Sequence, residues 1–356
     1  MKNRVIFPLV VLCVVMAVMV SNLNAQVEED QSKNRRIGSA AATELLIPVG
    51  ARDMAMGGSS IAVTNGVESI HWNPAGLARV PTSGEVMFSS MAYIADIRMN
   101  YGAVGLTFGN FGVVGISVRS LSFGDIPMTT NDDPDGDAGR TYSPAFMTFG
   151  MSYARRFTDA ITVGGTFKVI SEKMGRVNGS AVAIDIGVQY HGAGGIPGLN
   201  FGLVLKNYGP RMSFGGPGLL KRALSPDGRR AEQFYTLSTA KYDLPSTLEI
   251  GLSYERDLSE NMVAVVNGSF VNDNMALNAY RFGGEVGYRM EKLRVFGRGG
   301  YEVVPGNEGV DEFIFGPTVG GGLYYNTAGF EIMVDYAWRK TDLFEDNSVF
   351  SIKFGF

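Results

Sequence analysis

The chain is organised around residues 50–79, GARDMAMGGSSIAVTNGVESIHWNPAGLAR, which have neither the alternation of a strand nor the composition of an ordinary loop. The Gly57-Gly58 pair lets the backbone turn through positive φ or lie close against a neighbour. A short helical stretch can precede Asn73-Pro74 and must end there, because proline disfavours the α region for the residue before it. Among its charged side chains, Arg52, Asp53 and Glu68 need partners if they are buried. We therefore expect a compact, irregular segment that packs against the rest of the chain.

From Glu85 onward the sequence alternates between apolar and polar residues with a period of two. In the stretch 180–190, for example, Val182 and Ile184 share one face, and Ala183 and Asp185 share the other. This pattern is typical of a transmembrane β-barrel, whose outer face contacts lipid. About fourteen such segments occur, most near the ~9–11 residues with which a tilted strand crosses a bilayer. They span residues 84–96, 98–109, 111–123, 143–156, 161–174, 178–191, 198–207, 245–256, 261–272, 278–290, 292–304, 315–325, 328–340 and 347–356.

The connections between these segments alternate in length, as in outer-membrane barrels with short periplasmic turns and longer external loops. Every second connection is short, and the two longest cover residues 124–142 and 208–244. The connection around Ile97 is an exception, because it is external and short. The alternative fold, a soluble β-sandwich, gives no reason for such alternation. We predict an all-β chain, an antiparallel transmembrane barrel of about fourteen strands plugged by its amino-terminal segment.

The amino-terminal stretch resembles the signature of the PorV/PorQ family of outer-membrane barrel proteins, relatives of the FadL fatty-acid transporters. The resemblance is carried by residues that keep the order and spacing of that signature, namely Gly50, Arg52, Met54, Met56, Gly57, Gly58, Trp72, Asn73, Pro74, Ala75, Gly76 and Leu77. In that family the segment folds inside the barrel as a hatch, so the resemblance implies a FadL-like barrel. It divides the chain into a hatch, residues 38–82, and a barrel, residues 83–356.

Residues 1–25 have the pattern of a secretory signal peptide, with two basic residues, a mostly apolar run and small residues before the cleavage site. A membrane anchor is the alternative, but the run falls short of the roughly 20 apolar residues that a span needs. We predict cleavage after Ala25, a mobile charged tail over residues 26–37, and localisation in the bacterial outer membrane. Because Cys13 lies in the signal peptide, we expect no disulfide in the mature chain.

Composition and motifs argue against several functions. The net charge is −4 and no basic stripe is present, so nothing indicates nucleic-acid binding. Neither His71 nor His191 has ligand residues at metal-binding spacing, and we expect no metal and no cofactor. The absence of a nucleophile motif argues against an enzyme. Residues 131–137 look like a calcium loop, but Tyr142 stands where a bidentate Glu is needed, so we prefer a solvated turn and keep adventitious Ca²⁺ binding as the alternative.

Charged residues of both signs fall on the inward faces of the predicted strands. They are Lys168, Glu172, Asp185, Glu249, Arg281, Glu285, Arg289, Arg294, Arg298, Glu331, Asp335 and Arg339. Charges of opposite sign inside a barrel can pair with one another, and with Arg52 and Asp53 of the hatch. We therefore expect a filled interior, and the alternative is a water-filled channel lined by solvated charges.

The family resemblance implies a non-catalytic part in type IX protein secretion. Family members receive or tether proteins at the cell surface through external loops, so the implied partners are the secretion translocon, cargo or attachment-complex proteins, and outer-membrane lipid. In the longest external connection the candidate contacts are Phe214, Pro217, Lys221, Arg222, Phe234 and Tyr235. The alternative is FadL-like transport of hydrophobic small molecules. The charged inward faces favour protein binding, because a substrate tunnel should be lined by apolar residues.

The chain ends on Phe356, at the end of an amphipathic strand. This ending resembles the signal by which the outer-membrane insertion machinery recognises its clients, which makes that machinery a partner during biogenesis. A soluble edge strand as apolar as this one would be an aggregation hazard.

Overall fold

The computed structural model describes residues 38–224, 232–275, 277–305, 313–327 and 329–356. The predicted signal peptide, residues 1–25, and the predicted tail, residues 26–37, lie outside the described residues. Within the described part of the chain, no helix combines the length and the apolar composition needed to cross a membrane.

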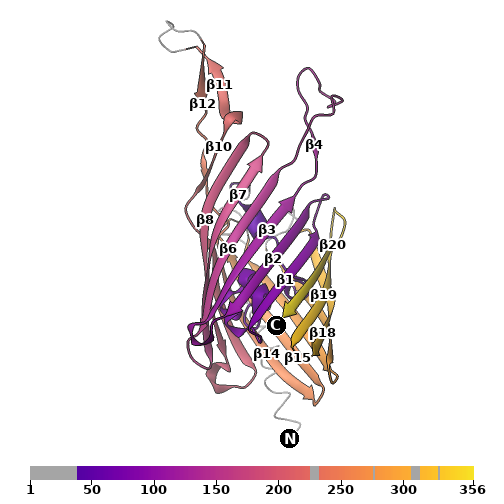
Figure 1. The fold of residues 1–356 in the computed structure, drawn as a ribbon. Coiled ribbons are helices and arrows are strands. Elements are labelled where there is room, and N and C mark those ends of the chain that lie inside the picture. The colour runs from indigo at the N-terminus through magenta and orange to yellow at the C-terminus, as the bar shows by residue number, and fades with distance from the viewer. Residues whose placement is uncertain (1–37, 225–231, 276, 306–312, 328) are drawn as a thin grey trace.

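Long antiparallel strands close into a barrel (Figure 1). Among the described residues the barrel has fourteen strands. The first strand pairs with the last, and β8 pairs with β9 to complete the closure. The barrel strands are β1 (Gly84–Ala92), β2 (Arg98–Thr107), β3 (Val113–Ser122), β6 (Ala145–Arg156), β7 (Ile161–Met174), β8 (Val177–His191), β9 (Leu199–Tyr208), β14 (Thr247–Ser259), β15 (Met262–Asp273), β16 (Ala279–Arg289), β17 (Leu293–Val303), β18 (Phe315–Thr327), β19 (Phe330–Thr341) and β20 (Asn347–Gly355). The predicted fold class and strand number are confirmed.

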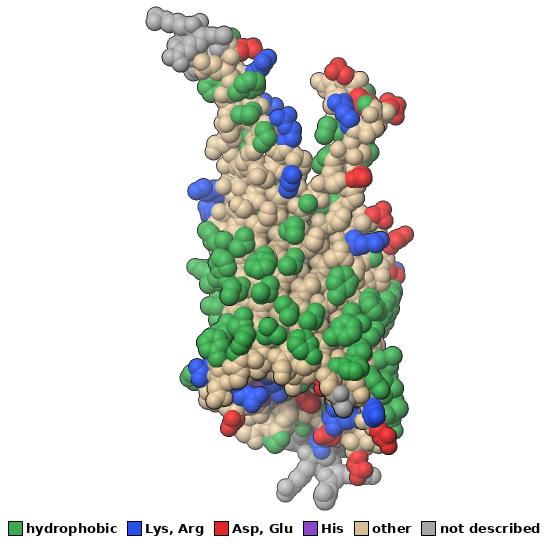
Figure 2. Space-filling model, in the orientation of Figure 1, with side chains coloured by type: hydrophobic (Ala, Val, Ile, Leu, Met, Phe, Trp, Pro, Cys, Tyr) green, Lys and Arg blue, Asp and Glu red, His purple; other side chains and the backbone are tan. Residues whose placement is uncertain are grey.

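The two faces of the wall differ as the period of two predicts. On β8, Val182 and Ile184 are exposed on the outer face, whereas Ala183 and Asp185 are buried on the inner face. Figure 2 shows hydrophobic side chains gathered in a band across the face of the barrel in view, with charged side chains above and below it. A continuous apolar band of this kind is costly in water and is buried by the hydrocarbon of a bilayer.

Two ribbons rise beyond one end of the barrel (Figure 1). The first pairs β4 (Ile126–Pro127) with β5 (Thr141–Tyr142). The second, which we call the distal ribbon, pairs β11 (Leu220–Ala223) with β12 (Gln233–Thr236). The distal ribbon is carried away from the wall by β10 (Met212–Gly215), which pairs with β8 and with β13 (Lys241–Tyr242).

The other end of the barrel has short connections, some of them single helical turns. They include η4 (Gly109–Phe111) and η5 (Ala193–Gly195). Long connections at one end and short ones at the other are the rule for outer-membrane barrels, so the ribbon end is the external face.

The hatch lies inside the barrel (Figure 1). Its short helices are η1 (Thr43–Leu46), α2 (Ala51–Ala55), η2 (Gly66–Glu68), α3 (Ser69–Trp72) and η3 (Pro74–Arg79). Helix α2 packs against β17, β18 and β19. Helix η3 packs against β6, β7 and β8, which lie on the opposite side of the lumen. The hatch therefore reaches across the full width of the lumen.

The end of the chain pairs with the first strand of the barrel. The backbone groups of Phe356 exchange two hydrogen bonds of 2.9 Å with those of Gly84, so the chain end is joined to the first strand.

In the Asp-rich loop, residues 131–137, the Asp133 carboxylate accepts hydrogen bonds from the backbone N–H groups of Asp137 and Ala138. Hydrogen bonds of this kind are typical of a turn-rich loop. Among the described residues, no three His, Cys, Asp or Glu side chains are grouped as metal ligands.

Candidate functional site

The glycines of the hatch signature lie where a larger residue does not fit. Gly57 and Gly58 follow α2 with φ values of 65° and 72°, which favour glycine. A Cβ on Gly57 would lie 3.0 Å from the backbone nitrogen of Tyr301, and one on Gly58 would lie 2.7 Å from the ring of Trp72. The turn after α2 is therefore left-handed and pressed against the wall, and it depends on both glycines. Gly50, which precedes α2, also has positive φ.

The Asn73-Pro74 pair joins the hatch to the wall. The side-chain Oδ1 of Asn73 accepts a hydrogen bond of 3.2 Å from the Ala75 N–H and so caps η3. Its Nδ2 donates to the carbonyl oxygens of Ile61, in the hatch, and Val188, in β8. Pro74 occupies the start of η3, where its missing N–H would have no partner in the helix. One asparagine side chain thus fixes both the start of η3 and its place against β8.

The other signature residues are buried inside the barrel. They are Arg52, Met54, Met56, Trp72, Ala75, Gly76 and Leu77. The indole Nε1 of Trp72 donates a 2.8 Å hydrogen bond to the Val49 carbonyl, which ties the start of the hatch to its centre. The residues of the sequence signature therefore form the packed interior of the hatch.

Inward-facing glycines of the wall surround the hatch, and we call them the glycine belt. Among the described residues they are Gly105, Gly115, Gly164, Gly187, Gly202, Gly251, Gly283, Gly300 and Gly320, each on a different strand. A Cβ on Gly202 would lie 2.7 Å from the Cα of Ala62, and one on Gly320 would lie 2.6 Å from the Cβ of Ala55. Because wall and hatch approach each other this closely, no layer of water fits between them at the belt.

Buried charges also tie the hatch to the wall. The Nε of Arg52 lies 3.1 Å from Glu285, which lies 2.5 Å from Arg298, which in turn lies 2.6 Å from Asp335. We call these four residues the charge cluster. All four side chains are nearly inaccessible to solvent, and their formal charges cancel. The predicted pairing of Arg52 with inward-facing charges is therefore present.

The two acidic residues of the hatch behave differently from each other. The carboxylate of Glu68 forms an ion pair with the ammonium group of Lys353 in β20, at 3.1 Å. The expectation that Asp53 pairs with a charge of the barrel is wrong, because its carboxylate accepts hydrogen bonds from the hydroxyls of Ser60 and Thr64 at 2.5 and 2.6 Å. These hydroxyls follow α2 within the hatch and reach the carboxylate first. Burial, assisted by Glu68, raises the pKa of Asp53 to about 6.

Arg119 of β3 holds the external edge of the hatch. Its guanidinium donates a 2.7 Å hydrogen bond to the Glu44 carbonyl and lies 2.6 Å from Nδ1 of His71. Burial, and then Arg119, keep the pKa of His71 well below its ordinary value, so a neutral ring accepts this hydrogen bond. Burial raises the pKa of Glu44 to about 8, and the neighbouring Glu172 adds to the shift. His71 is therefore a packed hatch residue.

The other histidine, His191, ends β8 beside Arg79 of the hatch and Asn200. The contact links the last helix of the hatch to the short-turn end of the wall.

Two cavities lie on the two sides of the hatch. The outer cavity, of about 650 Å³, is lined by strand ends near the ribbons and by Met54 and Gly57 of the hatch. The inner cavity, of about 320 Å³, lies at the short-turn end and is lined by Arg52 and Glu285 of the charge cluster. Helix α2 and the turn after it therefore separate the two cavities.

The outer cavity has largely apolar walls, although the alternation of the strands predicts a charged lumen. They include Ile47, Ile97, Phe123, Phe146, Leu277 and Phe313. The charged side chains that interrupt these walls are mostly paired: Lys206 contacts Glu249, and Arg281 lies 2.9 Å from Glu302. The expectation of a charged lumen therefore holds at the level of the hatch, while the space above it is apolar.

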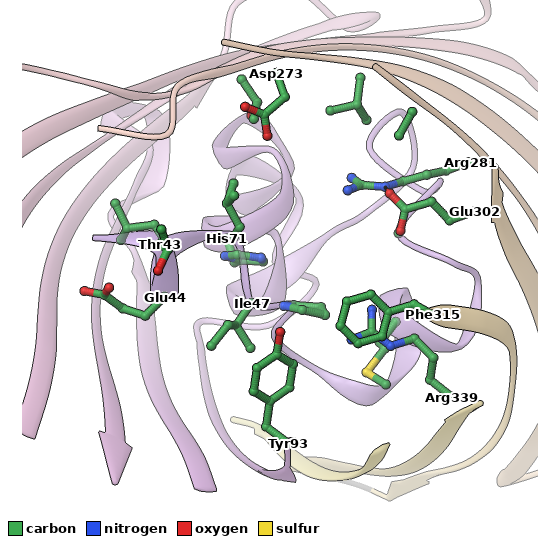
Figure 3. A pocket seen from close by; sticks show the side chains of 18 of the residues that line it. Thr43, Glu44, Ile47, His71, Tyr93, Asp273, Arg281, Glu302, Phe315 and Arg339 are labelled. Atoms are coloured by element: carbon green, nitrogen blue, oxygen red, sulfur yellow. Dashed lines mark hydrogen bonds and ion pairs between the residues drawn. The ribbon is translucent and has the colours of Figure 1, made fainter. Parts of the chain in front are cut away.

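Among the described Lys and Arg residues that line the outer cavity, Arg339 is the one without a carboxylate partner. Only 7% of the residue is exposed, and its Nε and Nη2 have no hydrogen-bond partner in the described part of the chain. The guanidinium carbon lies 3.6 Å from the ring centroid of Phe315, and the Phe315 ring stacks on Tyr93 at 6.3 Å. Figure 3 shows Arg339, from β19, and Tyr93, from the connection just after β1, pointing into the cavity. The alternation of β19 predicts that Arg339 faces inward, but no sequence signal shows that it lacks a partner.

The predicted partner-binding residues lie on or next to the distal ribbon. Exposed on the ribbon are Lys221, Arg222, Phe234 and Tyr235. The guanidinium of Arg222 lies 5.1 Å from the ring of Phe234, across the two strands. Phe214 packs against Tyr242 at the base, and Pro217 begins η6 (Pro217–Leu219). Phe214 and Pro217 therefore lie near the base, and the other four residues lie exposed on the two strands of the ribbon.

Comparisons with known proteins agree with this architecture. A family model described as "Type IX secretion system protein PorV" matches residues 29–193, which contain the hatch and the wall through β8. The monoaromatic hydrocarbon channel CymD has a TM-score of 0.54 and 13% identity, over 87% of this chain and 97% of that one. The Pseudomonas putida toluene transporter TodX has a TM-score of 0.53 and 11% identity, over 86% and 97%. The Ralstonia pickettii toluene transporter TbuX has a TM-score of 0.54 and 12% identity, over 86% and 98%. No curated protein matches the sequence.

The structural likenesses are at low identity and concern the fold alone. They make the barrel FadL-like, and this fold together with the family match points to the outer membrane. The sequence match covers the signature residues and the strands that enclose them. Over residues 29–193, which contain the hatch and the strands around it, the chain is similar to the family described as "Type IX secretion system protein PorV".

Proposed function

We propose that the protein takes part in type IX protein secretion by binding cargo or attachment-complex proteins at the cell surface, without catalysis. The observation that carries this proposal is the PorV match over residues 29–193. The distal ribbon supplies the contact surface, with the secretion translocon as a further partner.

The exposed residues of the distal ribbon support a binding role. Phe234 is 64% exposed and Leu220 is 41% exposed, on a two-stranded ribbon that stands away from the wall. An isolated two-stranded ribbon is marginally stable in water, and apolar side chains on it are usually covered by a partner. Aromatic and arginine side chains, such as Phe234 and Arg222, are the residue types that dominate binding energy at protein interfaces.

The packing of the hatch supports surface binding over passage. The glycine belt and the charge cluster close the lumen between the outer and inner cavities. A solute crossing the barrel would have to displace the hatch and break the ion pair between Arg52 and Glu285. Binding at the external face requires neither change.

The second candidate function is transport of a hydrophobic small molecule across the outer membrane. The apolar walls of the outer cavity favour it. Its structural neighbours CymD, TodX and TbuX are described as a hydrocarbon channel and toluene transporters. In this reading the hatch would have to move, and the turn at Gly57 and Gly58 would be the place where its backbone changes.

Shortening the distal ribbon separates the two functions. The Leu237 N–H donates a 2.9 Å hydrogen bond to the Leu219 carbonyl, so the ribbon can be replaced at these two positions by a short glycine linker. We expect the shortened variant to assemble in the outer membrane but to lose surface delivery of secreted cargo. A milder variant, Phe234→Ser with Tyr235→Ser, should lose part of it. The control is Leu343→Ser, which removes an apolar side chain that is 84% exposed in another external connection.

The transport alternative is tested with Gly57→Val and Gly58→Val. If the hatch must shift, these variants should lose uptake of a labelled long-chain fatty acid, because a β-branched residue restricts the backbone there. Normal secretion by the shortened-ribbon variant, together with lost uptake by the valine variants, would replace the secretion proposal with the transport one.

A further inference from the structure

We propose that the outer cavity binds an acidic, apolar segment of a polypeptide partner, and that a side-chain carboxylate of this segment pairs with Arg339. This inference rests on the proposed function, because it states the chemistry of the segment that a surface partner inserts. The distal ribbon and the outer cavity are then two parts of one external binding face.

Arg339 carries a buried positive charge that has no carboxylate partner among the described residues. Within the described residues three other cations of the lumen have carboxylate partners: Lys206 and Arg281 share Glu249, and Arg298 contacts Glu285. Arg119 contacts a backbone carbonyl and the His71 ring instead. Arg339 is buried to the same extent and has no carboxylate partner. Burying an unpaired charge is costly, so a fold that keeps one beside a cavity gains from a ligand that neutralises it.

The geometry of Arg339 fits a carboxylate. The guanidinium lies on the Phe315 ring, which leaves Nε and Nη2 as free donors in one plane. Two parallel N–H groups in a plane match the two oxygens of a carboxylate, and this bidentate pairing is the characteristic anion contact of arginine. The ring holds the guanidinium in place before the ligand arrives, which lowers the cost of ordering it.

The walls beside Arg339 fit apolar side chains. The ring of Phe313 lies 5.6 Å from Phe315, and Tyr93 stacks on the other side, so an aromatic surface borders the cation. The cavity volume of about 650 Å³ falls within the range of roughly 300–1,000 Å³ that is usual for ligand sites. A carboxylate flanked by aromatic or aliphatic groups would use both the charge and the walls.

The blind floor of the cavity favours a polypeptide segment over a transported molecule. Met54 and Gly57 of the hatch close the cavity, and the glycine belt holds Gly57 against β17. A segment of a larger protein needs only the external opening, since it enters and leaves from the same side. A transported solute needs an exit that the belt closes.

Peptide binding to the purified full-length protein in detergent tests the proposal. The probes are fluorescein-labelled peptides in which one aspartate is flanked on both sides by Phe, Leu or Val, and matched peptides with asparagine in its place. We expect the aspartate peptides to bind, and both the asparagine peptides and the variant Arg339→Gln to bind roughly ten- to hundredfold more weakly, as for loss of a charged hydrogen bond. The control is Arg294→Gln, because Arg294 also lies over an aromatic ring, that of Tyr324 at 5.0 Å, but lines the inner cavity. It should bind as the unchanged protein does.

Thermal unfolding supplies a second readout. Because Arg339 is buried without a partner, the variant Arg339→Met should unfold at a higher temperature than the unchanged protein. If Arg339 served only to stabilise the fold, the same substitution would lower the unfolding temperature. A lower unfolding temperature for Arg339→Met would overturn the proposal.

Three results of the binding assay would also overturn it: no aspartate peptide binds better than its asparagine partner, binding is the same in Arg339→Gln, or dodecanoate binds through Arg339 while no peptide does. The last result would assign the cavity to a small amphiphile. If peptide binding fails in this way while ribbon shortening still abolishes cargo delivery, this inference falls and the proposed function stands.

Discussion

The charge cluster gives a quantitative test of how the hatch is held. Arg52→Met removes the one cluster residue that belongs to the hatch and leaves Glu285, Arg298 and Asp335, which together carry an uncompensated negative charge. Removing one partner of a buried ion pair usually costs about 3–5 kcal/mol. Glu285 keeps its 2.5 Å contact with Arg298, so the lower end, about 3 kcal/mol, is expected for the docking of the hatch.

The reciprocal change distinguishes this electrostatic account from a loss of packing. Glu285→Gln alone leaves the cations Arg52 and Arg298 with one carboxylate, and it should weaken docking by a similar amount. The double variant leaves Arg298 and Asp335 as a neutral pair at 2.6 Å. The two losses should therefore not add, and the coupling free energy should be about 2 kcal/mol, within the range for residues in one ion-pair network.

Amide hydrogen exchange of residues 50–63 in detergent measures the docking. About 3 kcal/mol corresponds to exchange roughly 100-fold faster in Arg52→Met, with most of the protection regained in the double variant. The control is Arg289→Gln, whose 3.4 Å pair with Asp257 is exposed and should contribute less than about 1 kcal/mol. Unchanged exchange in both single variants, or strictly additive losses, would refute the idea that the cluster holds the hatch.

Three further outcomes are expected. Gly202→Val should displace the backbone near Ala62 and reduce the heat-modifiable, folded form in electrophoresis, whereas Gly297→Val, whose added Cβ meets no atom within 4 Å, should fold normally. In planar bilayers the protein should show little steady conductance, and large stable channels would contradict a closed lumen. Because the pKa of Glu44 is raised from 4.5 to about 8, its docked form retains a proton that the free carboxyl loses. Docking of residues 41–47 should therefore weaken as pH rises through that interval, measured by exchange corrected for its intrinsic pH dependence, and Glu44→Gln should abolish the trend.

The wall of the barrel was predictable because its signals are local. Each strand shows its two faces within ten or so residues, since lipid and lumen demand opposite side chains at alternate positions. Ile184 and Asp185, adjacent in sequence, are exposed and buried respectively, as the alternation predicts. The lengths of the connections gave the external end in the same way, because turn length is visible without any knowledge of what the turns contact.

The contacts of the lumen were less predictable because their partners are distant in sequence. Alternation shows that Glu285 and Arg339 both face inward, but not that one meets Arg52 of the hatch and the other meets only an aromatic ring. Asp53 was assigned a partner in the wall, and the local hydroxyl of Ser60 satisfies it instead. The outer cavity escaped prediction for the same reason, since its lining comes from strand ends scattered along the chain.

The contacts between hatch and wall also limit how often the lumen can open. Undocking the hatch would break the Arg52–Glu285 and Lys353–Glu68 pairs, both almost fully buried. At about 3 kcal/mol for each, two such losses hold the open form to on the order of one molecule in 10⁴, unless a partner stabilises it. A ligand that entered from outside would have to prefer the open form by a comparable free energy to cross the barrel. Retention of a ligand in the outer cavity requires none of this, because the cavity is already present with the hatch docked. The packing of the hatch therefore supports the proposed binding at the external face over passage through the barrel.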